Sequence, residues 1–134
     1  MTVARDVLAS VHAVCERKYA VETTMRTHRV TVDEPVARGG ADTGPSPLEA
    51  LASALAACTA ITLRMYAERK GWELETVRVD CRAFAAGHEY RFERSIRIAA
   101  PLEEAQRARL AEIAEKTPVT TIVKAGARVT TSVS

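Results

Sequence analysis

Apolar and polar residues alternate along the first third of the chain, a pattern typical of half-buried β-strands. Short polar pairs separate the alternating stretches, so consecutive strands are expected to lie side by side and antiparallel. The pattern therefore predicts a three-stranded antiparallel meander. Its strands are predicted over residues 10–16, 19–25 and 28–32.

A helix is predicted to begin at the end of residues 33–47, a stretch rich in Gly, Pro and Asp that otherwise forms a loop. Ser46 can be its N-cap, Pro47 suits the first helical position, and Glu49 can complete a capping box. Loops of this length in compact domains are often functional, so the loop itself is of interest.

The segment after this helix start is apolar nearly all round between residues 48 and 63, which indicates a helix buried on most of its faces. Gly71 marks its predicted end, after Lys70. The apolar stretch 50–63 is interrupted by Ser53 and by threonines, and it is too short to span a bilayer. We therefore expect no association with a membrane.

The second half of the chain returns to alternation and then to a helical period. The resulting order, βββ-α-ββ-α-β, predicts an α+β fold with a long central helix packed on antiparallel sheet. We expect one domain over residues 1–134. Strands are predicted over 74–84, 89–98 and 127–133 and a helix over 101–116, with Pro118 either ending that helix or beginning another turn.

Composition narrows the classes of partner. The 134 residues are 47% hydrophobic and carry a net charge of +2, with scattered arginines, which does not indicate nucleic-acid binding. Aromatic residues make up only 4%, so the core consists mostly of small aliphatic side chains that each bury little area. We expect the remaining burial to come from a homodimer.

The three cysteines, Cys15, Cys58 and Cys81, are too widely spaced for a disulfide framework or a zinc site. No signal peptide is recognisable, so we expect a cytoplasmic protein. Free cysteine is commonly a small buried residue, and packing is the favoured interpretation for Cys15 and Cys81. For Cys58 the pattern leaves both packing and reactivity open. It shares a helix face with Leu51, Leu55, Thr62 and Met65.

The stretch GPSPLEALASALAACTAITLRMYAERKGW resembles the central helix of the OsmC/Ohr superfamily of organic hydroperoxide-resistance proteins, and most closely its OsmC-like branch. DEPVARGGADTGPSP resembles the loop before that helix, and RARLAEIAEKTPVTTIV resembles the second helix and the segment after it. The resemblance covers nearly the whole chain. It implies an intertwined homodimer in which two central helices cross, with active sites at the subunit interface and no metal or prosthetic group.

The resemblance also implies a chemistry. A peroxidatic cysteine on the central helix attacks the O–O bond of an organic hydroperoxide and becomes a sulfenic acid. A second cysteine then condenses with it to a disulfide, which a dithiol reduces. Cys58 falls on the peroxidatic position. An arginine and a glutamate assist at the peroxidatic thiol; Arg26 and Arg29 are both candidates for the arginine, with Arg38 as a third.

Two residues depart from the family pattern. Threonine stands at position 117, where the resolving cysteine belongs, so the usual intramolecular disulfide cannot form; Thr117 can instead cap a turn begun by Pro118. Leu48 stands where the hydroperoxide-resistance branch has a glutamate. Glu49 follows it, nine residues before Cys58 and so on the opposite side of the helix, which favours the capping role.

The sequence therefore leaves three interpretations open. Cys58 is the thiol of a one-cysteine, peroxiredoxin-like peroxidase of the oxidative stress response, which an external thiol reduces. Cys81 is a candidate substitute resolver, provided that the two Cβ atoms come within about 4.5 Å. Alternatively, the protein binds a small apolar or thiol-containing ligand, or senses redox state, without turnover. Under a purely structural interpretation, Cys58 only fills the core.

Overall fold

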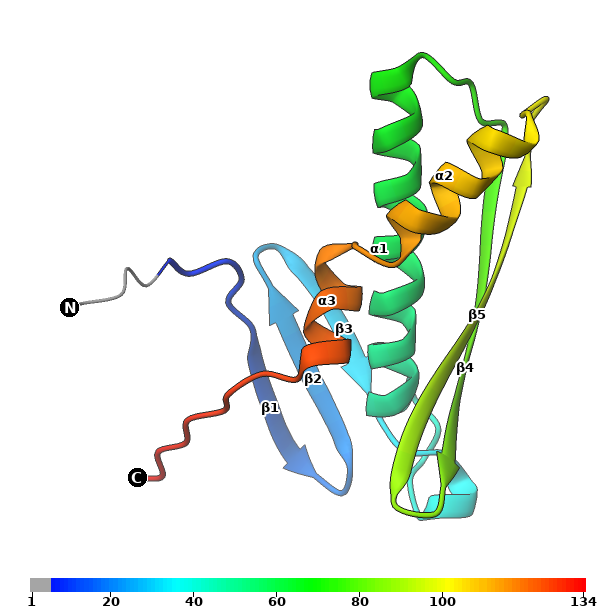
Figure 1. Cartoon of the computed structure of the whole chain (residues 1–134). Helices are drawn as coiled ribbons and strands as arrows, with labels where there is room; N and C mark the ends of the chain where they lie inside the picture. Colours follow the sequence, from blue (N-terminus) through cyan, green and yellow to red (C-terminus); the bar gives the residue numbers. More distant parts are fainter. Residues whose placement is uncertain (1–5) are drawn as a thin grey trace. The chain divides into compact units, whose positions relative to one another are not determined.

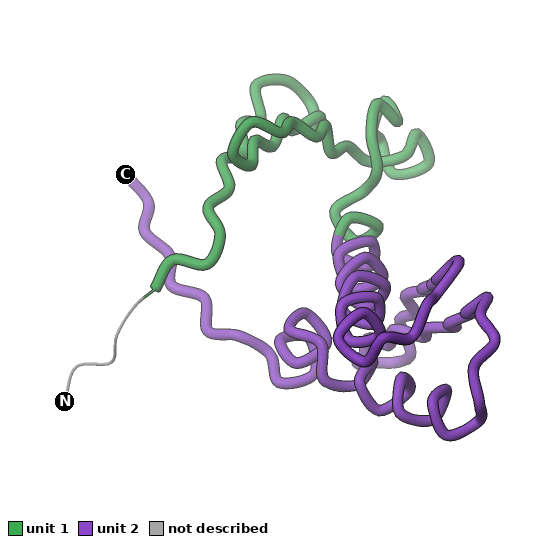
Figure 2. Tube along the Cα trace, turned by 90° about the horizontal axis from the view of Figure 1, so that it is seen from above, with its two compact units in different colours: residues 1–50 green, residues 51–134 purple. Residues whose placement is uncertain are grey.

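The computed structural model describes residues 6–134, which form two compact units (Figure 2). The first unit extends to Ala50 and contains a small sheet and the loop that follows it. The second begins at Leu51 and contains a long hairpin and most of the helical structure (Figure 1).

The first unit is built on the predicted antiparallel meander. Its strands are β1 (His12–Arg17), β2 (Ala20–Met25) and β3 (His28–Val32), paired in that order. The packing expected for Cys15 is wrong, because β1 is an edge strand that is exposed along its whole length. The Cys15 thiol instead donates to the carbonyl oxygen of Lys18, at 3.3 Å.

A buried carboxylate organises the loop after β3. The side chain of Asp33 is 1% exposed and accepts four hydrogen bonds, from the backbone N–H groups of Glu34, Ala41 and Thr43 and from the Thr43 hydroxyl. The hydroxyl bond is the largest of the effects that lower the pKa of Asp33 below its ordinary value. The loop is therefore held together by charge-assisted hydrogen bonds.

Two glycines allow this loop to fold tightly against its own backbone. A Cβ atom at Gly44 would lie 2.0 Å from the carbonyl oxygen of Thr31, and one at Gly40 would lie 1.9 Å from that of Glu34. The loop also contains one 3₁₀ turn, η1 (Val36–Arg38). Its backbone therefore approaches itself more closely than any side chain would permit.

Helix α1 (Pro47–Lys70) begins and ends where the sequence predicts. The backbone N–H of Ser46 donates to Glu49 Oε1 at 2.9 Å, and the backbone N–H of Glu49 donates to Ser46 Oγ at 3.2 Å. These bonds complete the capping box, and they lower the pKa of Glu49. Gly71 follows the last turn with a φ of 74°, a conformation that glycine adopts without strain.

Burial of α1 differs from the expectation. Its buried residues recur every four positions, so they form one stripe, and the prediction that most faces are buried is wrong for the single chain. The reason is that the other elements of the second unit cover one side of the helix only. The stripe consists of Leu55, Thr59, Leu63 and Ala67, whereas Leu48, Leu51, Ile61 and Met65 are exposed.

The complete helix is longer than the apolar stretch 50–63 on which the expectation about membranes was based. It is long and apolar enough to cross a membrane, as judged by length and composition alone. Core helices of soluble proteins meet the same criterion.

The core of the second unit lies between α1, α2 (Glu104–Ala114) and the hairpin of β4 (Thr76–Ala86) and β5 (Glu89–Ala99). The hairpin strands alternate between half-buried and exposed residues, as predicted, and they are antiparallel. The buried cluster is Leu63, Ala67, Leu74, Leu110 and Ala114, with Val77, Ile96 and Ile98 of the hairpin packed against it.

The end of the chain corrects the predicted order of elements. Pro118 begins a helix of its own, α3 (Pro118–Ala125). The strand predicted over 127–133 is not formed, and Val129 and Val133 are 85% and 93% exposed. An isolated strand leaves its backbone groups unpaired, and no strand within residues 6–134 pairs with this segment. The observed order is βββ-α-ββ-α-α, within the predicted α+β class.

Candidate functional site

Cys58 lies at the border between the buried stripe of α1 and its exposed apolar side. The thiol is half-buried, and its sulfur lies 3.9 Å from Thr62 Oγ1. Leu51 and Met65, two turns away on the same side of the helix, are 46% and 50% exposed. Cys58 is therefore neither sealed in the core nor surrounded by water.

The neighbouring residue, Thr59, points about 100° away from Cys58 around the helix axis and into the interior of the second unit. It is fully buried, and its hydroxyl donates to the carbonyl oxygen of Leu55 at 2.7 Å. A buried hydroxyl needs hydrogen-bond partners, and the oxygen of Thr59 finds one on β5.

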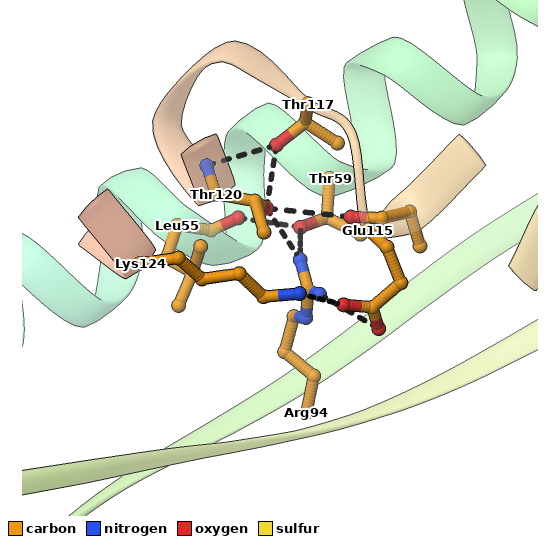
Figure 3. A network of polar contacts seen from close by, with 8 residues as sticks. Leu55, Thr59, Arg94, Glu115, Thr117, Thr120 and Lys124 are labelled. Carbon is orange, nitrogen blue, oxygen red and sulfur yellow. Dashed lines mark hydrogen bonds and ion pairs between the residues drawn. The ribbon is translucent and has the colours of Figure 1, made fainter. Parts of the chain in front are cut away.

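That partner is Arg94, whose guanidinium group reaches from β5 to α1 (Figure 3). Its side chain is only 12% exposed. Nη1 donates to Thr59 Oγ1 at 2.9 Å and to Thr120 Oγ1, on α3, at 2.7 Å. A buried cation is costly unless it is hydrogen-bonded and paired, so these bonds fix the side chain firmly.

Beyond Arg94, two buried threonines form the corner between α2 and α3. Thr117 is the N-cap of α3, because its hydroxyl oxygen accepts from the backbone N–H of Thr120 at 3.1 Å. The two hydroxyl oxygens are 2.6 Å apart, and the Thr120 hydroxyl donates to the carbonyl oxygen of Ala114 at 3.3 Å. Because the Thr120 hydroxyl uses its only proton for Ala114, the Thr117 hydroxyl is the donor in the bond between the two threonines. The capping role predicted for Thr117 is thus confirmed.

The charge of Arg94 is balanced by Glu115, which is shared with a second cation. Arg94 Nη2 lies 3.5 Å from Glu115 Oε1, and Lys124 donates to Glu115 Oε2. The Lys124 hydrogen bond is the main cause that lowers the pKa of Glu115, and the charge of Arg94 contributes further. Glu115 and Lys124 are both more than half exposed, so this ion pair lies at the rim of the network.

Cys81 lies directly opposite Arg94 in the β4–β5 ladder, on the half-buried face of the hairpin. Burial raises the pKa of the Cys81 thiol, while the positive charge of Arg94 acts in the opposite direction. This placement agrees with the packing interpretation of Cys81. Its role as a substitute resolver of Cys58 stays a prediction.

The arginines singled out from the sequence lie in the first unit. Arg26 occupies the β2–β3 turn with a φ of 56°, and Arg38 lies in η1. Arg29 forms an exposed ion pair with Glu22 at 3.1 Å. Cys58 belongs to the second unit, and assistance by any of these arginines stays a prediction.

Sequence reasoning missed Arg94, although the sequence contains a signal for it. The alternation of β5 places Phe92, Ile96 and Ile98 on the half-buried face, and position 94 has the same parity. A charged residue at an inward position requires buried partners.

Within residues 6–134, no three His, Cys, Asp or Glu side chains gather closely enough to hold a metal ion.

Comparison with known proteins identifies relatives of this chain. A family model described as OsmC-like protein matches residues 39–132. No curated protein gives a significant match. Among solved structures, an OsmC-like protein from Mycoplasma pneumoniae is similar with a TM-score of 0.78 and 18% identity, over 91% of either chain.

Two further solved structures are described by a function. An organic hydroperoxide resistance protein from Legionella pneumophila has a TM-score of 0.66 and 20% identity, over 90% of this chain and 92% of that one. A candidate organic hydroperoxide resistance protein from Vibrio cholerae, with captopril bound in one of its active sites, has a TM-score of 0.68 and 18% identity, over 94% and 90%. At these identities the likeness concerns the fold.

Proposed function

Because this chain belongs to the OsmC-like protein family, we propose that it reduces organic hydroperoxides through the thiol of Cys58. The observation that carries the proposal is the position of Cys58, half-buried at the edge of an exposed apolar surface of α1. Such a surface suits the hydrocarbon part of an organic hydroperoxide. The function named for the Legionella relative supports the same reaction.

In the proposed reaction, the Cys58 thiolate attacks one oxygen of the hydroperoxide and the O–O bond breaks. The leaving alkoxide takes up a proton and departs as an alcohol, while Cys58 becomes a sulfenic acid. Arg26 or Arg29 stabilises the thiolate in this scheme, as a nearby cation does in other reactive cysteines.

The second half of the cycle has to use an external thiol. Position 117 carries a hydroxyl that is buried and engaged in capping α3, so it supplies no resolving sulfur. A thiol attacks the sulfenic sulfur, releases water and forms a mixed disulfide with Cys58. A second thiol then restores the Cys58 thiolate and leaves as a disulfide.

We also propose that the active form is a homodimer in the cytoplasm. The exposed apolar side of α1 supports this part of the proposal, because a monomer would leave Leu51, Ile61 and Met65 in water. In a homodimer, the same helix of the second copy would remove this surface from water, so that no membrane is needed to cover it. The small net charge of +2 gives no indication of a nucleic-acid partner.

A second function is favoured by one specific observation. The engaged hydroxyl of Thr117 removes the usual resolving step, and a scaffold without turnover could still bind a small apolar or thiol-containing ligand. The captopril bound to the Vibrio relative is consistent with ligand binding on this fold. This alternative predicts that the ligand stabilises the protein without consumption of peroxide.

Intact mass measurement separates the two functions. The purified protein is treated with one equivalent of tert-butyl hydroperoxide in the presence of dimedone, which traps sulfenic acids. Wild type and the matched control Cys81→Ser are expected to gain one dimedone adduct, and Cys58→Ser none. An unmodified wild type would support the ligand-binding alternative, and an adduct on Cys58→Ser would place the reaction on another thiol.

A further inference from the structure

We propose that Arg94 is the positioning residue for Cys58, because it holds the turn of α1 that carries the thiol against the corner between α2 and α3. The inference rests on the proposed function of Cys58. Arg94 has no part in the family chemistry described above, which calls on arginines near residue 26.

The first contact fixes the rotation of α1 about its axis. Successive side chains of an α-helix point about 100° apart, so the direction of Thr59 determines the direction of Cys58. Thr59 is fully buried, and its oxygen is held between the Leu55 carbonyl and the guanidinium group of Arg94. A helix turn anchored in this way cannot rotate without breaking a buried hydrogen bond.

The second contact extends the anchor to the segment around position 117. The same nitrogen that reaches Thr59 also donates to Thr120, which is hydrogen-bonded in turn to Thr117 (Figure 3). In the family mechanism a disulfide would join positions 58 and 117. Here polar contacts hold the same two segments together, and these contacts do not depend on the oxidation state of Cys58.

Positioning matters for this reaction because the sulfur has to approach the O–O bond along a defined line. Misplacement of a reacting group by about 1 Å can cost on the order of 100-fold in rate. Alkylation of the same thiol by iodoacetamide is also an in-line displacement, but its iodide leaves without help from any protein group, so this rate depends less on where the turn holds the thiol. The two reactions therefore report differently on a turn that is chemically intact but wrongly oriented.

Glu115 allows positioning to be distinguished from a general effect of charge. Its carboxylate lies 3.5 Å from Arg94, at the rim of the network, and takes no part in the hydrogen bonds of the Thr59 and Thr120 hydroxyls. If the hydrogen bonds from Nη1 carry the effect, Glu115→Gln leaves the oxidation rate of Cys58 within about 2-fold of wild type. A larger acceleration by Glu115→Gln would mean that the net positive charge is what matters, and it would overturn the positioning role.

The decisive comparison uses Arg94→Met, Arg94→Lys and the matched control Arg91→Met, a substitution on the exposed face of the same strand. Cys58 oxidation by tert-butyl hydroperoxide is timed with the dimedone trap, and Cys58 alkylation by iodoacetamide is timed at the same pH. Circular dichroism checks that each variant is folded. In Arg94→Met we expect Cys58 to be oxidised on the order of 10-fold more slowly than in wild type. Its alkylation rate is expected to stay within about 2-fold of wild type.

Arg94→Lys is expected to recover part of the oxidation rate, because an ammonium group can still donate to one or both threonines. Arg91→Met is expected to match wild type. Oxidation of a folded Arg94→Met at the wild-type rate would overturn the inference, and so would equal losses of oxidation and alkylation. If Cys58 of the wild type is not oxidised, the proposed function is contradicted. The wild type is therefore measured first, before any variant is compared with it.

Discussion

Replacing Thr117 by valine tests whether the buried corner between α2 and α3 is held by hydrogen bonds. Valine keeps the branched shape of threonine and replaces by a methyl group the hydroxyl that caps α3 and contacts Thr120 Oγ1 at 2.6 Å. Loss of an N-cap costs about 1 kcal/mol, and loss of a further buried hydrogen bond costs about 1–2 kcal/mol. The free energy of unfolding is therefore expected to fall by about 2–3 kcal/mol.

Urea unfolding followed by the fluorescence of Trp72 measures this change. Trp72 is the only tryptophan of the chain and packs edge-on against Tyr66, with ring centres 5.8 Å apart, beside the core of the second unit. Its emission therefore reports on the unit that contains Thr117. Protein concentration has to be equal for all variants, because an oligomer gains apparent stability with concentration.

Two variants serve as controls for Thr117→Val. Thr117→Ser keeps the hydroxyl and loses one methyl group, so its loss is expected to be about 1 kcal/mol or less. Thr121→Val changes an exposed residue of the same helix and is expected to remain within about 0.5 kcal/mol of wild type. If Thr117→Val unfolds at the wild-type midpoint, or Thr117→Ser is as unstable as Thr117→Val, the hydrogen-bonded corner is not what stabilises this region.

Three further predictions concern the resolving position and the loop before α1. Thr117→Cys is expected to form a disulfide with Cys58 after hydroperoxide treatment, seen by mass spectrometry as the loss of two hydrogens; a persistent dimedone adduct would contradict this. Because hydrogen bonds lower the pKa of Asp33, stability from its carboxylate is present above the ordinary value of 3.8 and is lost as the pH falls through the lower value of the folded state. Asp33→Asn is thus expected to be less stable than wild type at neutral pH, with a gap that narrows below about pH 4 in acid titrations of unfolding; a constant gap would refute this. Gly44→Ala is expected to destabilise by about 1–3 kcal/mol, because its Cβ would lie 2.0 Å from Thr31 O, and an unchanged melting temperature would show that the loop yields freely.

Local signals in the sequence predicted much of the fold. The meander follows from alternation and short turns, and α1 begins at its predicted capping box because Ser46 and Glu49 satisfy each other within one turn. These features depend on neighbours in the sequence. The same is true of Thr117, whose capping role required only Pro118 and the turn after it.

Features that depend on distant partners were harder to predict. The segment 127–133 has the alternation of a strand, but pairing requires another strand that alternation does not specify. The burial of α1 was overestimated because composition reports how apolar a helix is and not how many of its sides are covered. Arg94 was missed, and its contacts join residues 26 and 35 positions apart, so its inward parity on β5 does not specify which residues are its partners.

The central claim is that Cys58 turns over organic hydroperoxide with an external thiol as reductant. Its most direct test is the steady-state loss of tert-butyl hydroperoxide in excess dithiothreitol, compared for wild type, Cys58→Ser and Cys81→Ser. We expect many turnovers for wild type and for Cys81→Ser, and only the background rate for Cys58→Ser. Loss of hydroperoxide at the background rate with wild type, or at the wild-type rate with Cys58→Ser, would contradict it.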